Sequence, residues 1–157
     1  MKNINELADE YESATSYFAK LVEGVAPTQL DIKAPGQWSA RQVIHHMADS
    51  EAQSYARLRR LLAEPEGSLI QGYDESAWAQ AQILGYDELP VANSLAVLLS
   101  VRAASLDLIR RMKPSDLDKF GLHSERGKFT ISQWLDAYSD HPRDHGAQLE
   151  RALQGLP

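Results

Sequence analysis

Two histidines in the last quarter of the chain have the spacing that lets a helix place two imidazoles on one metal ion. His141 and His145 are four residues apart, so on a helix they lie one turn apart on the same face. On a wheel of about 100° per residue, both fall within the arc of the segment's apolar side chains. Buried imidazoles need partners, because an unpaired polar group is costly to bury. A shared metal ion would provide one.

A third inward histidine comes from a different segment. His46 lies on the flank of an apolar stripe, whereas His45 points nearly the opposite way and is expected at the surface or behind the ligands. His123 lies in an expected loop and is predicted to be solvated, with a role only if it lies near the mouth of the site. Three neutral imidazoles suit Zn, Ni or Fe(II) and leave one coordination position open. His46, His141 and His145 are therefore the candidate metal ligands; the alternative is a set of core histidines bonded to carboxylates and backbone carbonyls.

Acidic residues near these histidines are candidates for orienting the imidazoles. Asp49, Glu51 and Asp144 lie close in sequence to His46 or His145. A carboxylate that accepts a hydrogen bond from a ligand imidazole fixes its orientation. Glu51 also points into the apolar stripe, so it needs a partner of some kind.

Four amphipathic segments are predicted to be the helices that position these residues. They cover approximately residues 3–24, 38–63, 90–112 and 130–153. Their apolar residues recur at spacings of three and four, while Ser39 and Thr130 are placed to cap the second and fourth segments. The pattern predicts an all-α protein, a four-helix bundle formed as a single domain over residues 1–157.

Long loops are expected between some of these helices. The connections at 27–37 and 64–89 are both long, and the second is predicted to contain a short helix at 74–82. Long connections in a bundle often shape a binding site. No segment shows a strong strand pattern.

The composition argues against several classes of function. The 157 residues include 22 acidic and 16 basic side chains, a net charge of -6, and the basic ones are scattered, unlike those of nucleic-acid binders. There is no cysteine, which excludes thiolate metal sites and a cysteine nucleophile and is consistent with a cytoplasmic location. The N-terminus lacks the apolar run of a signal peptide, and the longest apolar-rich run, 95–99, is too short to cross a bilayer. No membrane partner is expected.

Several segments resemble those of the DinB/YfiT-like superfamily. The specific ones are WSARQVIHHMADS at 38–50 and IQGYDESAW at 70–78, and the segments 94–99 and 129–149 are similar as well. The resemblance covers nearly the whole chain in the same order and spacing. It implies a four-helix bundle, often a homodimer, with a divalent metal on three histidines. Carried over position by position, those ligands are His46, His141 and His145.

The resemblance also implies a range of activities. The superfamily includes S-transferases that use bacillithiol, mycothiol or glutathione, a mycothiol-dependent maleylpyruvate isomerase, and proteins described only as metal-dependent hydrolases. The leading hypothesis is transfer of an external low-molecular-weight thiol to a small electrophile, because a divalent cation stabilises thiolate over thiol. Arg57 and Tyr73, which resemble residues of the family signature, are candidates to hold an anionic thiol. The alternatives are hydrolysis by metal-bound water and a non-enzymatic dimeric binding or stress protein.

Two residues depart from the pattern of the superfamily. Arg102 stands where the third helix usually carries a histidine, and Pro142 lies between two of the candidate ligands. A proline inside a helix removes a hydrogen bond and clashes with the preceding turn, at a cost of ~3 kcal/mol or more. A bend is therefore expected near residues 137–138, with an effect on the site that the sequence leaves open.

Overall fold

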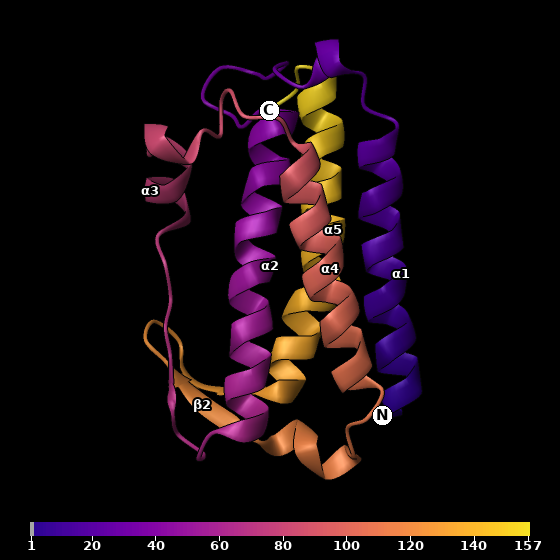
Figure 1. The fold of residues 1–157 in the computed structure, drawn as a ribbon, viewed down its shortest axis with the longest axis vertical. Coiled ribbons are helices and arrows are strands. Elements are labelled where there is room, and N and C mark those ends of the chain that lie inside the picture. Colours follow the sequence, from indigo (N-terminus) through magenta and orange to yellow (C-terminus); the bar gives the residue numbers. More distant parts are fainter. Residues whose placement is uncertain (1) are drawn as a thin grey trace.

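Four long helices form the body of the protein in the computed structural model, which describes residues 2–157 (Figure 1). They are α1 (Ile4–Glu23), α2 (Ala40–Ala63), α4 (Ala92–Ile109) and α5 (Ile131–Leu153). Helix α2 packs against α4 and α5, and α1 packs against the same two helices. The segment between α2 and α4 returns along the length of the bundle, so these two helices run in the same direction (Figure 1). The predicted four-helix bundle is confirmed.

Capping side chains define where the helices begin. The hydroxyl groups of Ser39 and Thr130 accept hydrogen bonds from the backbone N–H groups of Gln42 and Gln133, and the two glutamines reach back to the cap residues. This reciprocal pair satisfies backbone donors that a helix start would otherwise leave free. Both predicted caps are confirmed. The third helix is shorter than predicted, since it covers only Ala92–Ile109.

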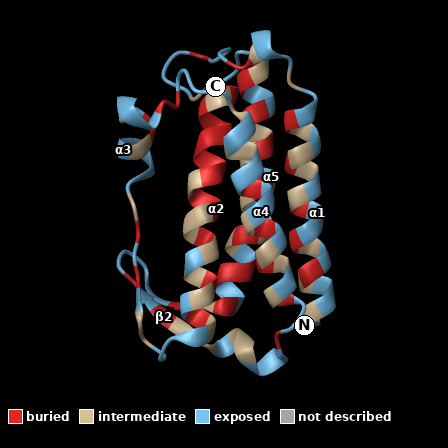
Figure 2. Ribbon diagram, viewed as in Figure 1, coloured by how far each residue is buried: buried red, intermediate tan, exposed pale blue. Residues whose placement is uncertain are grey.

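The core consists of two apolar clusters with a polar layer between them. On α2, Met47 belongs to one cluster and Leu58 to the other, and on α5 Leu149 and Tyr138 are divided in the same way. The buried faces of all four helices point inward (Figure 2). Between the clusters lie buried or half-buried polar residues: Ser50, Glu51, Ser54, Arg102, Ser105, His141 and His145. Two of the candidate metal ligands, His141 and His145, are therefore part of a polar layer inside the bundle.

A small sheet, which the sequence did not predict, lies at one end of the bundle. Its strands β1 (Leu69–Ile70), β2 (Phe120–His123) and β3 (Gly127–Thr130) pair in that order, parallel between β1 and β2 and antiparallel between β2 and β3. Strands of two to four residues are too short to show the alternation that marks a strand in sequence. Gly121 permits the close pairing, because a Cβ atom there would lie 2.8 Å from the Ser68 carbonyl oxygen.

The long connections lie beside the bundle. The predicted short helix is α3 (Glu75–Gln80), which stands off the side of α2 and is capped by Asp74 (Figure 1). Three 3₁₀ turns complete the connections: η1 (Pro27–Gln29), η2 (Gln82–Leu84) and η3 (Pro114–Asp118). Through β1, the connection that carries α3 is fixed to the segment that follows α4.

Helix α4 is more apolar than its neighbours. Its 18 residues have a mean hydropathy of 1.4, so by length and composition it could span a membrane, a test that core helices also pass. Its outward face carries the exposed side chains of Val97 and Leu99. One such helix is weak evidence for a membrane protein. The predictions of no membrane partner, a homodimer and a cytoplasmic location therefore stay predictions.

Candidate metal centre

The three predicted histidines converge between α2 and α5. His46 comes from α2, and His141 and His145 come from α5; one ring nitrogen of each lies within 4.8 Å of those of the other two. The Nε2 atoms of His46 and His145 are 3.2 Å apart. Two zinc–nitrogen bonds of about 2.0–2.1 Å at a tetrahedral angle place their nitrogens roughly 3.3 Å apart. The spacing of the rings therefore fits a shared divalent cation.

Hydrogen bonds on the far side of two rings turn their Nε2 atoms toward this point. The Nδ1–H of His145 donates to the side-chain oxygen of Gln148 at 2.7 Å. His141 Nδ1 donates to Glu51 Oε1 at 3.3 Å. With the proton on Nδ1, the Nε2 of each ring carries a lone pair that can bind a metal. The Ser50 hydroxyl group lies 3.4 Å from the Nε2 of His141.

The chain alone does not satisfy His46. Its side chain is fully buried, and its Nδ1 has no hydrogen-bond partner among residues 2–157. If the proton of His46 is on Nε2, this nitrogen donates to His145 Nε2, and His46 Nδ1 is left without a donor. If the proton is on His46 Nδ1, the unprotonated Nε2 atoms of His46 and His145 face each other at 3.2 Å. A cation beside the two Nε2 atoms removes that lone-pair repulsion. The donor set therefore fits a metal ion.

Burial keeps His46 and His145 uncharged. Burial and the neighbouring imidazoles of His145 and His141 lower the pKa of His46 to about 3. Burial, followed by the imidazole of His141, lowers the pKa of His145 to about 4. Metal ligands must be unprotonated imidazoles, and these two rings are unprotonated at neutral pH.

We expect the metal-free chain to lose stability as the pH falls from 7.5 to 5.5. In the unfolded chain, His46 and His145 have the ordinary pKa of 6.5, whereas in the folded chain both values lie well below it. The unfolded state therefore binds more protons below pH 6.5, so the stability present above that pH decreases as protons are added. Urea midpoints at the two pH values measure the effect. A midpoint that does not move would contradict the burial of neutral imidazoles.

A buried ion pair supports the ligand His141. Glu51 Oε1 accepts a hydrogen bond from the guanidinium of Arg102 at 2.6 Å as well as from His141, and neither Glu51 nor Arg102 is exposed as a side chain. Arg102 is thus the partner that Glu51 was predicted to need. Its other donors reach the Thr15 hydroxyl group and the Tyr11 carbonyl oxygen, so this one side chain ties all four long helices together.

The same arginine satisfies the carbonyl group that Pro142 leaves free. A proline at position 142 has no N–H to donate to the carbonyl oxygen of Tyr138, four residues earlier. Arg102 Nη1 donates to that oxygen at 3.1 Å, and α5 continues through the proline to Leu153. The two departures from the superfamily pattern therefore compensate each other. The bend predicted near residues 137–138 stays a prediction.

The other acidic candidates lie away from the ligands. Asp49 accepts a hydrogen bond from the Tyr86 hydroxyl group at 2.6 Å, and the side chain of Asp144 is exposed. Of the predicted orienting residues, the structure brings Glu51 alone into hydrogen-bond contact with a ligand. Gln148, which holds His145, was missed, although its spacing of three from that histidine is a helical-face signal.

Two further histidines are buried, which excludes the surface position that was one of two predicted for His45 and contradicts the solvated position predicted for His123. His45 is 5 % exposed: its Nε2–H donates to the Leu89 carbonyl oxygen, and its Nδ1 accepts from Ser94, which ties α2 to the start of α4. His123, expected in a solvated loop, is 6 % exposed because it lies in strand β2. The error follows from the missed sheet, since the strand covers a side chain that a loop would leave in water.

Arg57 and Tyr73 lie near the centre, but of the two only Arg57 lines the cavity that contains His141. Arg57 donates to the Tyr138 hydroxyl group at 2.7 Å and to the Gln71 carbonyl oxygen at 3.0 Å. Tyr73 packs against Trp78 with ring centroids 4.6 Å apart, and its hydroxyl group is buried without a hydrogen-bond partner among the described residues. Burial raises the pKa of Tyr73.

Two hollows adjoin the triad. One of about 320 Å³ is lined by the loop at 36–38, the first residues of α3, His145 and Gln148. The other, of about 90 Å³, contains His141. Glu75 lines both, with Oε2 4.0 Å from His46 Nε2, a contact that was not predicted from the sequence. The long connections therefore do border the candidate site.

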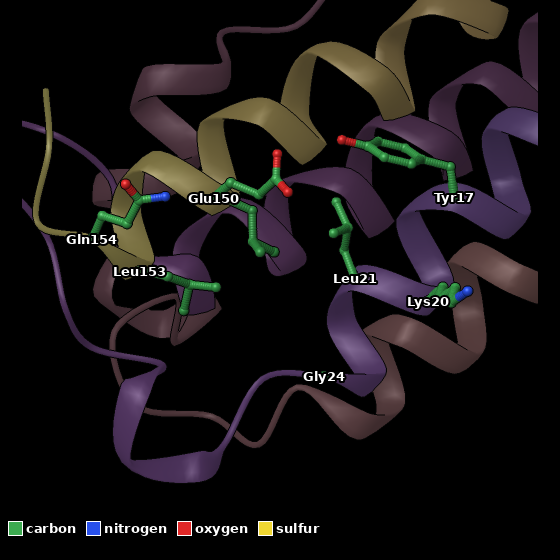
Figure 3. A pocket seen from close by; sticks show the side chains of 8 residues that line it. Tyr17, Lys20, Leu21, Gly24, Glu150, Leu153 and Gln154 are labelled. Atoms are coloured by element: carbon green, nitrogen blue, oxygen red, sulfur yellow. The ribbon is translucent and has the colours of Figure 1, made fainter.

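A larger hollow lies away from the histidines. It has a volume of about 580 Å³ and lies between α1 and the C-terminal part of α5 (Figure 3). Leu21, Leu149 and Leu153 supply much of its wall, with Lys20 and Glu150 beside them. None of the described residues that line it is a histidine, so its walls lack the groups that the metal centre offers.

Comparison with known proteins agrees with this fold. The family model of the DinB superfamily matches residues 10–149. A protein of Oceanobacillus iheyensis named "Putative metal-dependent hydrolase" is 33 % identical over 93 % of this chain and 83 % of its own length. A protein of Bacillus mycoides with the same description is 31 % identical over 98 % of this chain and 87 % of its own length.

A solved structure has the same arrangement of helices. It is YfiT from Bacillus subtilis, described as "a probable metal-dependent hydrolase with an unusual four-helix bundle topology". The likeness has a TM-score of 0.85 at 26 % identity and covers 98 % of this chain and 89 % of that one. With the family model spanning most of its length, this chain belongs to the DinB superfamily.

Proposed function

We propose that this protein is a metal-dependent enzyme that binds one divalent cation through His46, His141 and His145 and acts on a small molecule. The observation that carries the proposal is the convergence of three imidazoles, with two Nε2 atoms at the spacing of metal ligands. The lowered pKa values of His46 and His145 and the unsatisfied His46 ring support it. The choice among Zn, Ni and Fe depends on supply, because three imidazoles accept all of them.

Bound at this centre, a divalent cation would acidify a nucleophile and polarise the substrate. The chain's own residues would provide the orientation and the proton acceptor. Glu51 and Gln148 hold two of the rings. Glu75 is the carboxylate that faces the triad from α3, about half exposed and able to accept a proton at Oε2. A general base must lie within reach of the proton it takes, directly or through one water.

Hydrolysis of a small substrate is the activity that the relatives' descriptions favour. The hollow of about 320 Å³ beside His145 is within the usual range for small-molecule sites. Transfer of an external thiol is the second candidate. The cationic side chains beside His141, including Arg57, favour an anionic co-substrate, and a chain without cysteine needs a thiol from outside.

Replacing Glu75 by glutamine is expected to lower turnover by about 10²–10⁴-fold while metal content stays unchanged. The amide keeps the size of the side chain but cannot accept the proton. Metal-loaded protein is assayed with activated aryl esters and, separately, with an electrophilic aryl halide with and without added thiols. Product that forms without thiol indicates hydrolysis, and a strict thiol requirement indicates transfer.

Three controls accompany this assay. His46→Ala and chelated wild-type protein should be inactive, whereas Glu66→Gln, an exposed change outside the site, should be fully active. Activity that persists in metal-free His46→Ala would refute the proposed function. Unchanged turnover in Glu75→Gln would remove this residue from the proposed mechanism.

A further inference from the structure

A small cavity beside His141 collects basic side chains from three separate parts of the chain. It has a volume of about 90 Å³ and is lined by Ser50, Arg57, Glu75, His123, Arg126, Phe129, Ala137, Tyr138 and His141. The unpredicted sheet builds it, because β2 carries His123 and the turn between β2 and β3 carries Arg126. The strand β2 contacts α2, the helix that carries Arg57.

The two arginines of this cavity have no acidic partner. Arg41, Arg60 and Arg110 each pair with a carboxylate at the surface, and Arg102 pairs with one inside. Within residues 2–157, neither Arg57 nor Arg126 forms an ion pair. Arg57 donates only to neutral oxygens, and its Nε is buried without an acceptor. Two guanidinium groups at one small cavity, of which that of Arg126 is exposed, therefore form no ion pair within the chain that the structure describes.

His123 adds a neutral donor. Its Nδ1 accepts a hydrogen bond from the backbone N–H of Glu125 at 3.2 Å, so in the neutral ring the proton is on Nε2. Phe129 packs against one side of the ring. Within the described chain, no acceptor contacts Nε2, which leaves an N–H group for a ligand of this cavity.

The acidic residues nearby do not neutralise this cluster. Glu75 lines the cavity from the side of the triad, 4.0 Å from His46 Nε2. Glu125 is exposed and lies beside Gly72, where its carboxylate would be within 3 Å of an added Cβ atom. Charge is therefore divided across the site, with a carboxylate beside the metal ligands and unpaired cations beyond His141.

We infer that this cavity is a subsite for the carboxylate group of a small ligand whose reactive atom lies at the metal centre. An arginine fork matches the planar carboxylate, and a neutral imidazole N–H adds a third donor. A volume of about 90 Å³ is far below the ~300 Å³ of sites for whole drug-sized ligands. The subsite thus takes one end of a molecule. The inference rests on the proposed function for the role of the other end.

A fluorine NMR titration of the metal-free protein tests the subsite independently of any metal. Fluoroacetate is compared with 2-fluoroethanol, which has nearly the same size and no charge. We expect fluoroacetate to bind at least about tenfold more tightly, with an affinity that falls as salt is added. Arg126→Gln and Arg57→Gln should each remove most of that preference. Arg126 makes no hydrogen bond within the described chain, so its replacement leaves the fold intact.

The matched control is Arg111→Gln, which removes an exposed arginine outside the cavity. It should leave the preference for fluoroacetate unchanged. Equal binding of the two probes in the wild-type protein, or an equal loss in Arg111→Gln, would overturn the inference. If the protein bound no metal, the proposed function would be overturned. The fluoroacetate titration would still decide whether the subsite exists, because it uses metal-free protein.

A second titration identifies which molecule carries the carboxylate. Mercaptoacetate and 2-mercaptoethanol are added to protein loaded with Co(II), and binding is followed by the sulfur-to-cobalt charge-transfer band. Tighter binding of mercaptoacetate, lost in Arg126→Gln, supports the subsite and assigns it to a thiol co-substrate. Displacement of fluoroacetate by mercaptoacetate without that band supports the subsite and assigns it to the molecule that is attacked. No competition between the two acids would overturn the inference.

Discussion

Replacing His141 by alanine is expected to reduce bound divalent metal from one ion per chain to well below one, with at least a 100-fold loss of affinity. The change removes one of three nitrogen ligands. Even the loss of a residue that only orients a ligand lowers metal affinity by about 10–100-fold. The ring is partly exposed and its other contacts are weak, so the fold should survive. Elemental analysis of untagged protein purified without added metal, followed by calorimetric titration with Zn²⁺, measures both quantities.

The chain provides its own matched controls for this experiment. His45 and His123 are buried histidines outside the triad, and His45→Gln and His123→Gln should keep one metal per chain. His46→Ala and His145→Ala should behave like His141→Ala. Equal metal content in His141→Ala and the wild type would mean that the ion, if present, is held elsewhere.

Replacing Arg102 by methionine is expected to lower the free energy of unfolding by about 3–5 kcal/mol. Methionine fills much of the same space but leaves the buried Glu51 carboxylate without its cation. It also removes the donors to the carbonyl oxygens of Tyr11 and Tyr138. Because Pro142 cannot donate to Tyr138, that carbonyl group would then be buried without a partner. Urea unfolding of the metal-free protein measures the loss.

Two variants separate the buried charge from a general effect of substitution. The double variant Arg102→Met with Glu51→Gln should be more stable than Arg102→Met alone, since no charge is then left unpaired. Arg111→Met, at an exposed position, should change stability by no more than about 0.5 kcal/mol. An Arg102→Met protein within 1 kcal/mol of the wild type would refute the role given to this side chain.

The helices were predictable because local signals and packing signals agree in them. Thr130 caps α5, and the apolar spacing that follows continues to Leu149. Prediction failed where an element has only a few residues or exists because of contacts with residues far away in the sequence. The strand at Leu69–Ile70 has two residues and exists only because it pairs with Leu122 and His123, more than 50 positions away. No local pattern contains that partner, and the predicted exposure of His123 failed with it.

The candidate site was predictable to the extent that helical geometry determines it. A spacing of four placed His141 and His145 on one face, and the apolar stripe of α2 pointed His46 inward. The residues that complete the site reach it from other elements, through side-chain contacts that helical spacing does not determine. Glu75 approaches from α3, and Arg102 reaches across from α4. Arg102 and Pro142 each looked unfavourable alone, and only the folded chain shows that one satisfies the group that the other leaves free.

X-ray absorption at the zinc edge of the wild-type protein tests the central claim most directly. After loading with one equivalent of Zn²⁺, the spectrum should show three imidazole nitrogens at about 2.0–2.1 Å, with the remaining position taken by oxygen. In His141→Ala, the imidazole count should fall to two or the ion should be lost. A wild-type spectrum with fewer than three imidazoles, or one dominated by carboxylate oxygen, would contradict the assignment of His46, His141 and His145 as a metal centre.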